Sequence, residues 1–325
     1  MKKIKEFLKE YFLFILIVII GFIITWVPVP YYIEGPGGLL PLKDRFTINN
    51  EKVSNYHLAY VSSYKGNILN ILLSYLSDDY DVYPETKESG NNKEVDFRNR
   101  LLLEEANQDA LIYAYIKAER DVDIKSEEVY ITYIYDEAKT DLEVGDKIIL
   151  IDGEEVLSKS SLKEKIESKN KGDKIIFKVE NNLKTYTRYA YVLEIEGKKL
   201  IGVLPTVKRE IEVNPSIKFT FDKSESGSSG GFMTTLAIYD LLVEEDIAKG
   251  LKIAGTGTID AYGNVGEIGG IEYKIMGAID EDVDIFFLPI ENLEEAKETL
   301  KRKNKDLNLV AIKHFDEAIE YLKNV

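Results

Sequence analysis

The stretch Gly227-Ser228-Ser229-Gly230-Gly231 surrounds a serine with glycines, and Lys274 follows 45 residues after Ser229, at the end of Ile268-Gly269-Gly270-Ile271-Glu272-Tyr273-Lys274. Glycines permit a sharp turn and let a backbone approach a substrate closely. Residues 218–221 alternate like a strand, and apolar residues recur at helical spacing over residues 232–242. The serines are therefore expected at a strand-to-helix turn, beside helix N-terminal N–H groups that can stabilise an oxyanion. An ordinary glycine-serine loop remains the alternative at this point.

A serine nucleophile needs a base, and the composition limits the choice. The chain has no cysteine and only two histidines, His57 and His314. A thiol nucleophile and a three-histidine zinc site are excluded, and no metal or other cofactor is expected. The bases that remain are His314, which would act with Ser229 and Asp284 in the chain order of α/β-hydrolases, or a lysine made neutral by burial. Lys274 suits the second case, because it precedes an apolar helical run.

Nucleotide binding is not expected from the glycine-rich segments. In Gly255-Thr256-Gly257-Thr258-Ile259-Asp260, the aspartate occupies the place of the third glycine of a dinucleotide-binding loop, where its carboxylate would repel a pyrophosphate. No Walker A sequence occurs anywhere in the chain. Catalysis is therefore expected to be independent of ATP.

Residues 11–33 form an uncharged, apolar run that predicts a transmembrane anchor, because it is long enough to span about 30 Å of hydrocarbon. Residues 1–10 carry four lysines, which predict a cytoplasmic tail and an extracellular location for everything after the anchor. No alanine occurs before Ala59, so no Ala-x-Ala cleavage site is present and a cleaved signal peptide is not expected. We therefore expect a single-pass protein of the cell membrane.

The charge balance bears on the partners of the exported part. The net charge is −15, and the first ten residues, with four lysines and two glutamates, make it less negative than the rest of the chain would be. Nucleic acids and anionic headgroups require clustered lysine and arginine, so no nucleic-acid partner is expected.

Residues 34–120 are expected to form a membrane-proximal α/β segment that ends in a long helix. Strands are predicted over residues 46–48 and 56–61, a short helix over 68–73 and a helix from Phe97 to about Ala118.

Residues 121–204 are expected to form a compact, mostly β module. The run Leu142-Glu143-Val144-Gly145-Asp146-Lys147 continues through a buried strand to the turn Asp152-Gly153, and this pattern resembles a PDZ domain. PDZ domains bind extended peptides at a sheet edge, so the resemblance implies docking of a peptide or protein substrate. No glycine-rich loop for a terminal carboxylate can be located. A module that only spaces or packs its neighbours is the alternative.

The C-terminal part, residues 205–325, resembles the proteolytic domain of Lon proteases. The resemblance rests on the serine stretch together with Thr256-Gly257, Gly263, Val265 and the stretch from Ile268 to Lys274. With the anchor and the PDZ-like module, the chain is similar to the membrane-anchored PDZ-Lon serine proteases of Gram-positive bacteria, including those that trim secreted peptide pheromones. The resemblance implies an α/β (α+β) multidomain fold and leaves the oligomeric state open, although Lon-type domains often form rings.

By this resemblance Ser229 is the nucleophile, Lys274 is the general base and Thr256 orients the lysine amine. The sequence departs from the usual Gly-Pro-Ser-Ala-Gly of the family at Ser228 and Gly230, and Ser226 stands where many Lon domains carry aspartate. Ser226 and Ser228 are therefore alternative candidates for the nucleophile. Besides the α/β-hydrolase triad, a non-catalytic, membrane-tethered peptide-binding protein is the remaining functional alternative.

Overall fold

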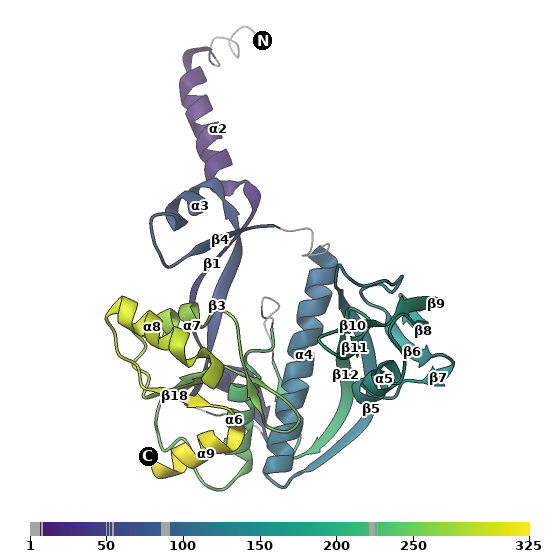
Figure 1. The fold of residues 1–325 in the computed structure, drawn as a ribbon. Helices are drawn as coiled ribbons and strands as arrows, with labels where there is room; N and C mark the ends of the chain where they lie inside the picture. Colours follow the sequence, from purple (N-terminus) through teal and green to yellow (C-terminus); the bar gives the residue numbers. More distant parts are fainter. Residues whose placement is uncertain are drawn as a thin grey trace.

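The computed structural model describes residue 7 and residues 9–49, 51, 53, 55–85, 92–220, 225 and 227–325. Figure 1 shows one helix, α2, projecting from a mixed α/β body, with a separate group of strands beside the long helix α4. We refer to the described residues of 28–120 and 215–325 as the α/β unit, and to residues 121–214 as the β-module. The protein thus has a mixed α/β architecture.

The α/β unit is built on a six-stranded sheet with the order β18-β17-β14-β3-β1-β4. The middle of this sheet is parallel: β14 pairs in parallel with both β3 and β17, and β17 with β18. The other two strands are antiparallel, β1 to β3 and β4 to β1. The strands are β1 (Pro28–Pro41), β3 (Tyr56–Asn67), β4 (Asp81–Pro84), β14 (Ile253–Gly255), β17 (Ile285–Pro289) and β18 (Leu309–Ile312).

Helices cover both faces of this sheet. Successive strand residues point to opposite sides, so neighbouring residues of one strand pack in different cores. On one face, Phe287 packs in a core with α4 (Asn92–Lys117), α6 (Gly231–Leu242) and α9 (Phe315–Asn324). On the other, its neighbour Phe286 packs with α7 (Ile271–Ala278) and α8 (Leu293–Lys303). Both phenylalanines are fully buried. Burial of each contributes about 1.5–3 kcal/mol, so the sheet is held from both sides.

Short elements complete the α/β unit. A two-stranded pairing joins the segment before the serine stretch to the first third of the chain, through β13 and β2. A second small pairing joins β15 and β16, between Thr256 and Lys274. These elements are η1 (Leu42–Asp44), β2 (Phe46–Ile48), α3 (Ile68–Ser74), β13 (Ile217–Phe219), β15 (Thr258–Ile259), β16 (Val265–Gly266) and η3 (Ile290–Asn292).

The β-module is a sheet of order β12-β5-β6-β8-β9 with its own hydrophobic core, in which helix α5 (Lys159–Glu167) takes part through Leu162 and Ile166. Its first and last residues, Asp121 and Asn214, are paired across β5 and β12. The chain therefore enters and leaves the module at one place, as an insertion does. The strands are β5 (Asp121–Ile134), β6 (Lys147–Ile151), β7 (Glu154–Glu155), β8 (Lys174–Asn181), β9 (Lys184–Tyr191), β10 (Leu193–Ile195), β11 (Lys198–Leu200) and β12 (Val203–Asn214).

Helix α4 fastens the β-module to the α/β unit. The side-chain amide of Gln108 accepts from the backbone N–H of Arg209 and donates to its carbonyl, each at 2.9 Å. The Arg209 guanidinium donates to Asp109 and Glu127, each at 2.8 Å. Burial raises the pKa of Asp109 to about 6, although Arg209 opposes the shift. A largely buried arginine held by two carboxylates from different elements strengthens this junction, because removing Arg209 would leave both partly buried carboxylates without this cation.

The division of the chain differs from the predicted boundaries. Residues 34–120 are not a separate segment, since β1 and β3 belong to the same six-stranded sheet as β14, β17 and β18. The predicted boundary at residue 204 lies within β12, which pairs along its length with β5. The physical reason is that strand pairing joins residues far apart in sequence, and local periodicity carries no information about such partners.

The predicted transmembrane helix over residues 11–33 is shorter than expected. Helix α2 covers Phe12–Trp26, 15 residues, and the chain becomes strand β1 from Pro28. Prolines at 28 and 30 explain the correction, because proline lacks an N–H and forces the preceding residue out of the helical region; Val27 is extended. Among the helices that the structure describes, none combines the length and the apolar character needed to cross a membrane.

Candidate active site

Three elements bring the three predicted site residues together. Ser229 lies in the turn before α6, Thr256 directly follows β14, and Lys274 is in the first turn of α7. The Lys274 Nζ atom lies 2.8 Å from Ser229 Oγ and 2.8 Å from Thr256 Oγ1. Thr256 and Lys274 are buried, with 0% and 2% of their surface exposed. The side chains therefore meet beyond the carboxyl end of β14, where open α/β sheets commonly place their sites.

The backbone around Ser229 is held by the segment that follows β14. The Thr256 hydroxyl donates to the Ser229 carbonyl at 3.0 Å, and the Gly257 N–H donates to the same carbonyl at 2.8 Å. The Gly257 carbonyl in turn accepts from Phe232 N–H in the first turn of α6. Since the Thr256 proton is given to a carbonyl, its Oγ1 is left to accept from the lysine. Thr256 thus fixes both the serine backbone and the amine.

The start of α7 places Lys274. Its N-cap residue, Gly270, has φ +66°, and an added Cβ would lie 2.9 Å from Val61 Cγ2, so both conformation and space require glycine. Asn292, which is buried, donates to the Ile268 carbonyl at 2.9 Å and accepts from the Ile268 N–H at 3.0 Å. Asn292 was not expected from the sequence, because a single asparagine gives no signal of which backbone it pairs with.

Burial changes the acidity of the lysine. Desolvation lowers the pKa of Lys274 from 10.5 to about 8, because the charged ammonium loses water that the apolar surroundings do not replace. A fraction of the amine is then neutral near neutral pH and has a lone pair that can accept the Ser229 proton. The arrangement can do what a general base does, at the distance that proton transfer requires.

Two backbone donors beside the serine are available for a developing oxyanion. Within the described part of the chain, the N–H groups of Ser229 and Gly230 donate to no protein acceptor. An added Cβ at Gly230 would lie 2.8 Å from Leu58 Cδ2 on β3, so glycine lets this turn pack on the sheet. This contact gives a physical reason for glycine where the Lon resemblance expects alanine.

The other candidates for the chemistry are not brought to Ser229. Both ring nitrogens of His314 have backbone partners: Nε2 lies 3.0 Å from the Tyr262 carbonyl, and Nδ1 accepts from Asp316 N–H. The Asp284 carboxylate accepts from Lys252 N–H at 2.7 Å. The hydrogen bonds of the Ser229-Asp284-His314 triad are therefore not formed.

Of the two alternative serines, Ser228 is described and shows no side-chain bond to a base. The carbonyl of Ser228 accepts a hydrogen bond from Gly231 N–H. Ser226 lies outside the described residues. The described residues also contain no group of three or more His, Asp or Glu side chains placed to hold a metal ion.

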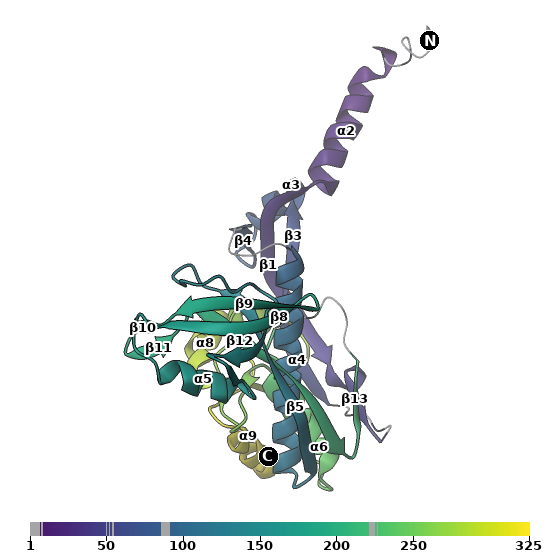
Figure 2. The same cartoon turned by 90° about the vertical axis from the view of Figure 1, so that its right-hand side faces the viewer.

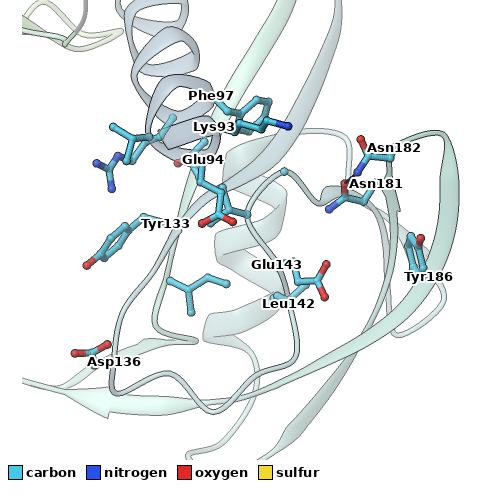
Figure 3. Close-up of a pocket in the computed structure, with 16 residues that line it drawn as sticks. Lys93, Glu94, Phe97, Tyr133, Asp136, Leu142, Glu143, Asn181, Asn182 and Tyr186 are labelled. Atoms are coloured by element: carbon cyan, nitrogen blue, oxygen red, sulfur yellow. Dashed lines mark hydrogen bonds between the residues drawn. The ribbon is translucent and has the colours of Figure 1, made fainter. Parts of the chain in front are cut away.

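Two pockets lie away from this site. One of about 850 Å³ lies between the first turns of α4 and the β-module, and its lining includes Phe97, Tyr133, Leu142 and Glu143 (Figure 3). The other, of about 1460 Å³, lies between α4 and the strands β12 and β13. Neither is lined by Ser229, Thr256 or Lys274.

Comparison with known proteins addresses the C-terminal part. Residues 223–324 match the Lon protease (S16) C-terminal proteolytic domain. The chain is 25% identical over 138 residues to a Lon protease of Desulfatibacillum aliphaticivorans, covering 40% of this chain and 16% of that protein. It is 33% identical over 96 residues to a Lon protease of Elusimicrobium minutum, covering 30% of this chain and 11% of that protein. The chain thus spans a small part of these relatives, and the match supports a serine peptidase.

Part of this chain is similar to solved structures of PDZ domains. The PDZ domain of an SdrC-like protein from Listeria monocytogenes is 26% identical, with 24% of this chain and 85% of that chain covered and a TM-score of 0.22. The corresponding PDZ domain from Listeria innocua is also 26% identical, with 24% and 92% covered and a TM-score of 0.23.

Proposed function

We propose that this protein is an ATP-independent serine endopeptidase in which Ser229 is the nucleophile and Lys274 is the general base. The observation that carries the proposal is the buried amine of Lys274, 2.8 Å from Ser229 Oγ and with its pKa lowered to about 8. A lysine in contact with water would be almost fully protonated at neutral pH and would not accept a proton. The match to the Lon proteolytic domain supports the same chemistry.

In the proposed reaction, Ser229 Oγ attacks the carbonyl carbon of the scissile bond as its proton passes to Lys274 Nζ. Thr256 Oγ1 accepts from the amine and keeps its lone pair directed at Ser229. The N–H groups of Ser229 and Gly230 donate to the oxyanion of the tetrahedral intermediate. The Lys274 ammonium then gives its proton to the departing amine, leaving an acyl ester on Ser229. Water, deprotonated by the again neutral Lys274, hydrolyses the ester and restores the free hydroxyl.

The catalytic part is proposed to lie on the outer side of the cell membrane. Helix α2 and the apolar residues around it would be the anchor. The four lysines before this run and the absence of charge within it support that orientation. The substrates would then be extracellular peptides or proteins, and secreted signalling peptides are the class that the resemblance implies. The β-module would dock them, since β12 is an edge strand of its sheet.

Substitution of the two residues tests the mechanism. Incubation of the full chain in detergent with secreted peptides, followed by mass analysis, should reveal cleavage that Ser229→Ala and Lys274→Ala each abolish. His314→Ala should leave cleavage intact, and Ser228→Ala should do the same. Loss in His314→Ala with retention in Lys274→Ala would replace the lysine base by a histidine triad. Peptide binding without cleavage by the unaltered protein would instead support a binding protein.

A further inference from the structure

Helix α3, Ile68–Ser74, carries its apolar residues on the outside of the molecule. Five apolar side chains at one-turn spacing form one stripe that continues into the turn after the helix, and all of them are exposed, Leu72 by 58% and Leu76 by 82%. We call this stripe the α3 face; it consists of Ile68, Leu69, Leu72, Leu73 and Leu76. Helices on the surface of a protein in water normally turn such a stripe inward, so this one is oriented for an apolar neighbour.

The inner side of α3 is the less apolar one. Ser74 is buried, and its hydroxyl donates to the Asn70 carbonyl. Ile71 packs inward, since an added Cβ on Gly66 would lie within 3.1 Å of its Cγ1. The segment from Ile68 to Leu76 contains no charged residue. The exposure of apolar residues is therefore a property of the whole helix and not of a single position. Its outward stripe is apolar throughout, and its buried side includes a serine.

The α3 face continues the surface of α2. The two helices contact one another, and the Asn67 side chain, which caps α3, donates to the Thr25 carbonyl at 2.6 Å. Figures 1 and 2 both show α3 at the root of α2, at the end of the body away from the C-terminus. Trp26 and Tyr75 are each 74% exposed there. Tryptophan and tyrosine favour the boundary between headgroups and acyl chains.

We propose that the α3 face inserts into the headgroup–acyl boundary of a lipid bilayer and thereby seats the α/β unit against the membrane. The proposal rests on the membrane location proposed above. A bilayer fits this surface better than a protein groove, because α2 exposes apolar residues on all sides and α3 extends them at its end. With no basic residue in the α3 face, attraction comes from apolar burial, so zwitterionic phosphatidylcholine, which has no net charge, suffices as the lipid.

The single tryptophan of the chain makes the depth of each helix measurable. The probe is the full chain in phosphatidylcholine vesicles whose acyl chains carry bromine close to the headgroup. In the natural sequence, quenching of Trp26 reports whether α2 is in the membrane. In the double variant Trp26→Phe, Leu76→Trp, we expect bromine to reduce the fluorescence by about half or more, because the face lies about 5–10 Å deep. The matched control Trp26→Phe, Tyr262→Trp places tryptophan at a residue that is 80% exposed and should not be quenched. Its neighbour Gly263 bonds to Phe315 at the start of α9, which Figure 1 shows at the end of the body away from α3.

The outcomes separate the two proposals. Quenching at positions 26 and 76 but not at 262 supports insertion of the α3 face. Quenching at 26 without quenching at 76 overturns it and leaves the membrane anchor standing. No quenching at either position overturns both. Protection of position 76 from an aqueous quencher, without quenching by bromine, would show that protein covers the face and would also overturn the proposal. Retained peptide cleavage by each variant verifies that it is folded.

Discussion

Lys274 combines two properties that oppose one another in water, a basic amine and a neutral fraction near neutral pH. Burial lowers its pKa to about 8. The amine must be neutral to accept the Ser229 proton, so we expect kcat/KM to rise with pH through about 8 and to level off above it. Hydrolysis of a peptide without ionisable groups, measured from pH 6 to 10, checks this profile. Lys274→Arg should be inactive throughout, because a guanidinium stays charged. A rate that is constant over the range would contradict a lysine base.

The same burial predicts a cost in stability. The pKa of Lys274 is about 8 in the folded protein and 10.5 when exposed. Between these values the unfolded state binds more protons, so this group makes the protein more stable as pH rises from 8 to 10.5, and its full penalty is present below 8. The difference corresponds to roughly 3 kcal/mol.

Methionine at position 274 should remove that penalty while nearly preserving the shape. We expect Lys274→Met to raise the melting temperature of the protein at pH 7 and to give a smaller gain near pH 10.5, while abolishing cleavage. Calorimetry at the two pH values measures both gains. An equal change at both, as in a control Lys297→Met on the exposed side of α8, would indicate that the lysine is not destabilised by burial.

At the scale of elements, the segment that leads into α7 is held by Asn292, the N-cap residue of α8. Asn292 satisfies both backbone groups of Ile268, two residues before the glycine that begins α7. In Asn292→Ala both groups lose their partners while buried, at a cost of about 1–3 kcal/mol for each unsatisfied group. We therefore expect a lower melting temperature, together with reduced kcat as Lys274 loses its position. Thermal denaturation and peptide hydrolysis measure the two effects. Asn308→Ala, which removes an exposed bond to the Asp284 carbonyl, should change neither by much.

Local patterns predicted many elements because periodicity is a local property. The strand at residues 147–151 and the helix from Phe232 to Leu242 coincide with β6 and α6 within one residue. Ser229, Thr256 and Lys274 were placed together by the resemblance, and their side chains do meet. The contribution of Asn292 could not be predicted, because its partner Ile268 lies 24 residues away in sequence. Helix α3 was predicted from the sequence, but the pattern did not indicate that its apolar side is the exposed one.

At the scale of the whole molecule, the order of the strands in the sheet could not be predicted from the sequence patterns. β14 has only three residues and lies between β3 and β17, so its partners come from opposite ends of the chain. Residues 34–120 looked like a segment of their own because each element within them is locally well marked. Pairing of β3 with β14, and of β1 with β3, makes them part of one sheet with the C-terminal strands instead. Hence the region that matches the Lon proteolytic domain, residues 223–324, covers only part of the α/β unit.

This arrangement leads to opposite expectations for two shortened chains. A fragment of residues 205–325 lacks β1, β3 and α4, so it exposes one side of β14 and the core beneath α6, and we expect it not to fold. A chain in which residues 122–213 are replaced by a short flexible linker keeps the whole sheet. The residues that the linker joins, Asp121 and Asn214, are paired across β5 and β12, with their Cα atoms about 5 Å apart. A short linker can therefore close the gap without straining the fold.

We therefore expect the internally shortened chain to melt cooperatively and to cleave short peptides in a Ser229-dependent way. It should be less stable than the full chain, because α4 loses the bonds of Gln108 and Asp109 to Arg209. Circular dichroism on heating, together with hydrolysis assays in detergent, compares both shortened chains with the full one. If the fragment 205–325 folds and cleaves peptides while the internally shortened chain does neither, the sheet of the α/β unit is not what supports the site. If docking is the role of the β-module, only long peptides reach the edge of β12 in the full chain. The internally shortened chain should then show a raised KM for long peptides and an unchanged KM for short peptides.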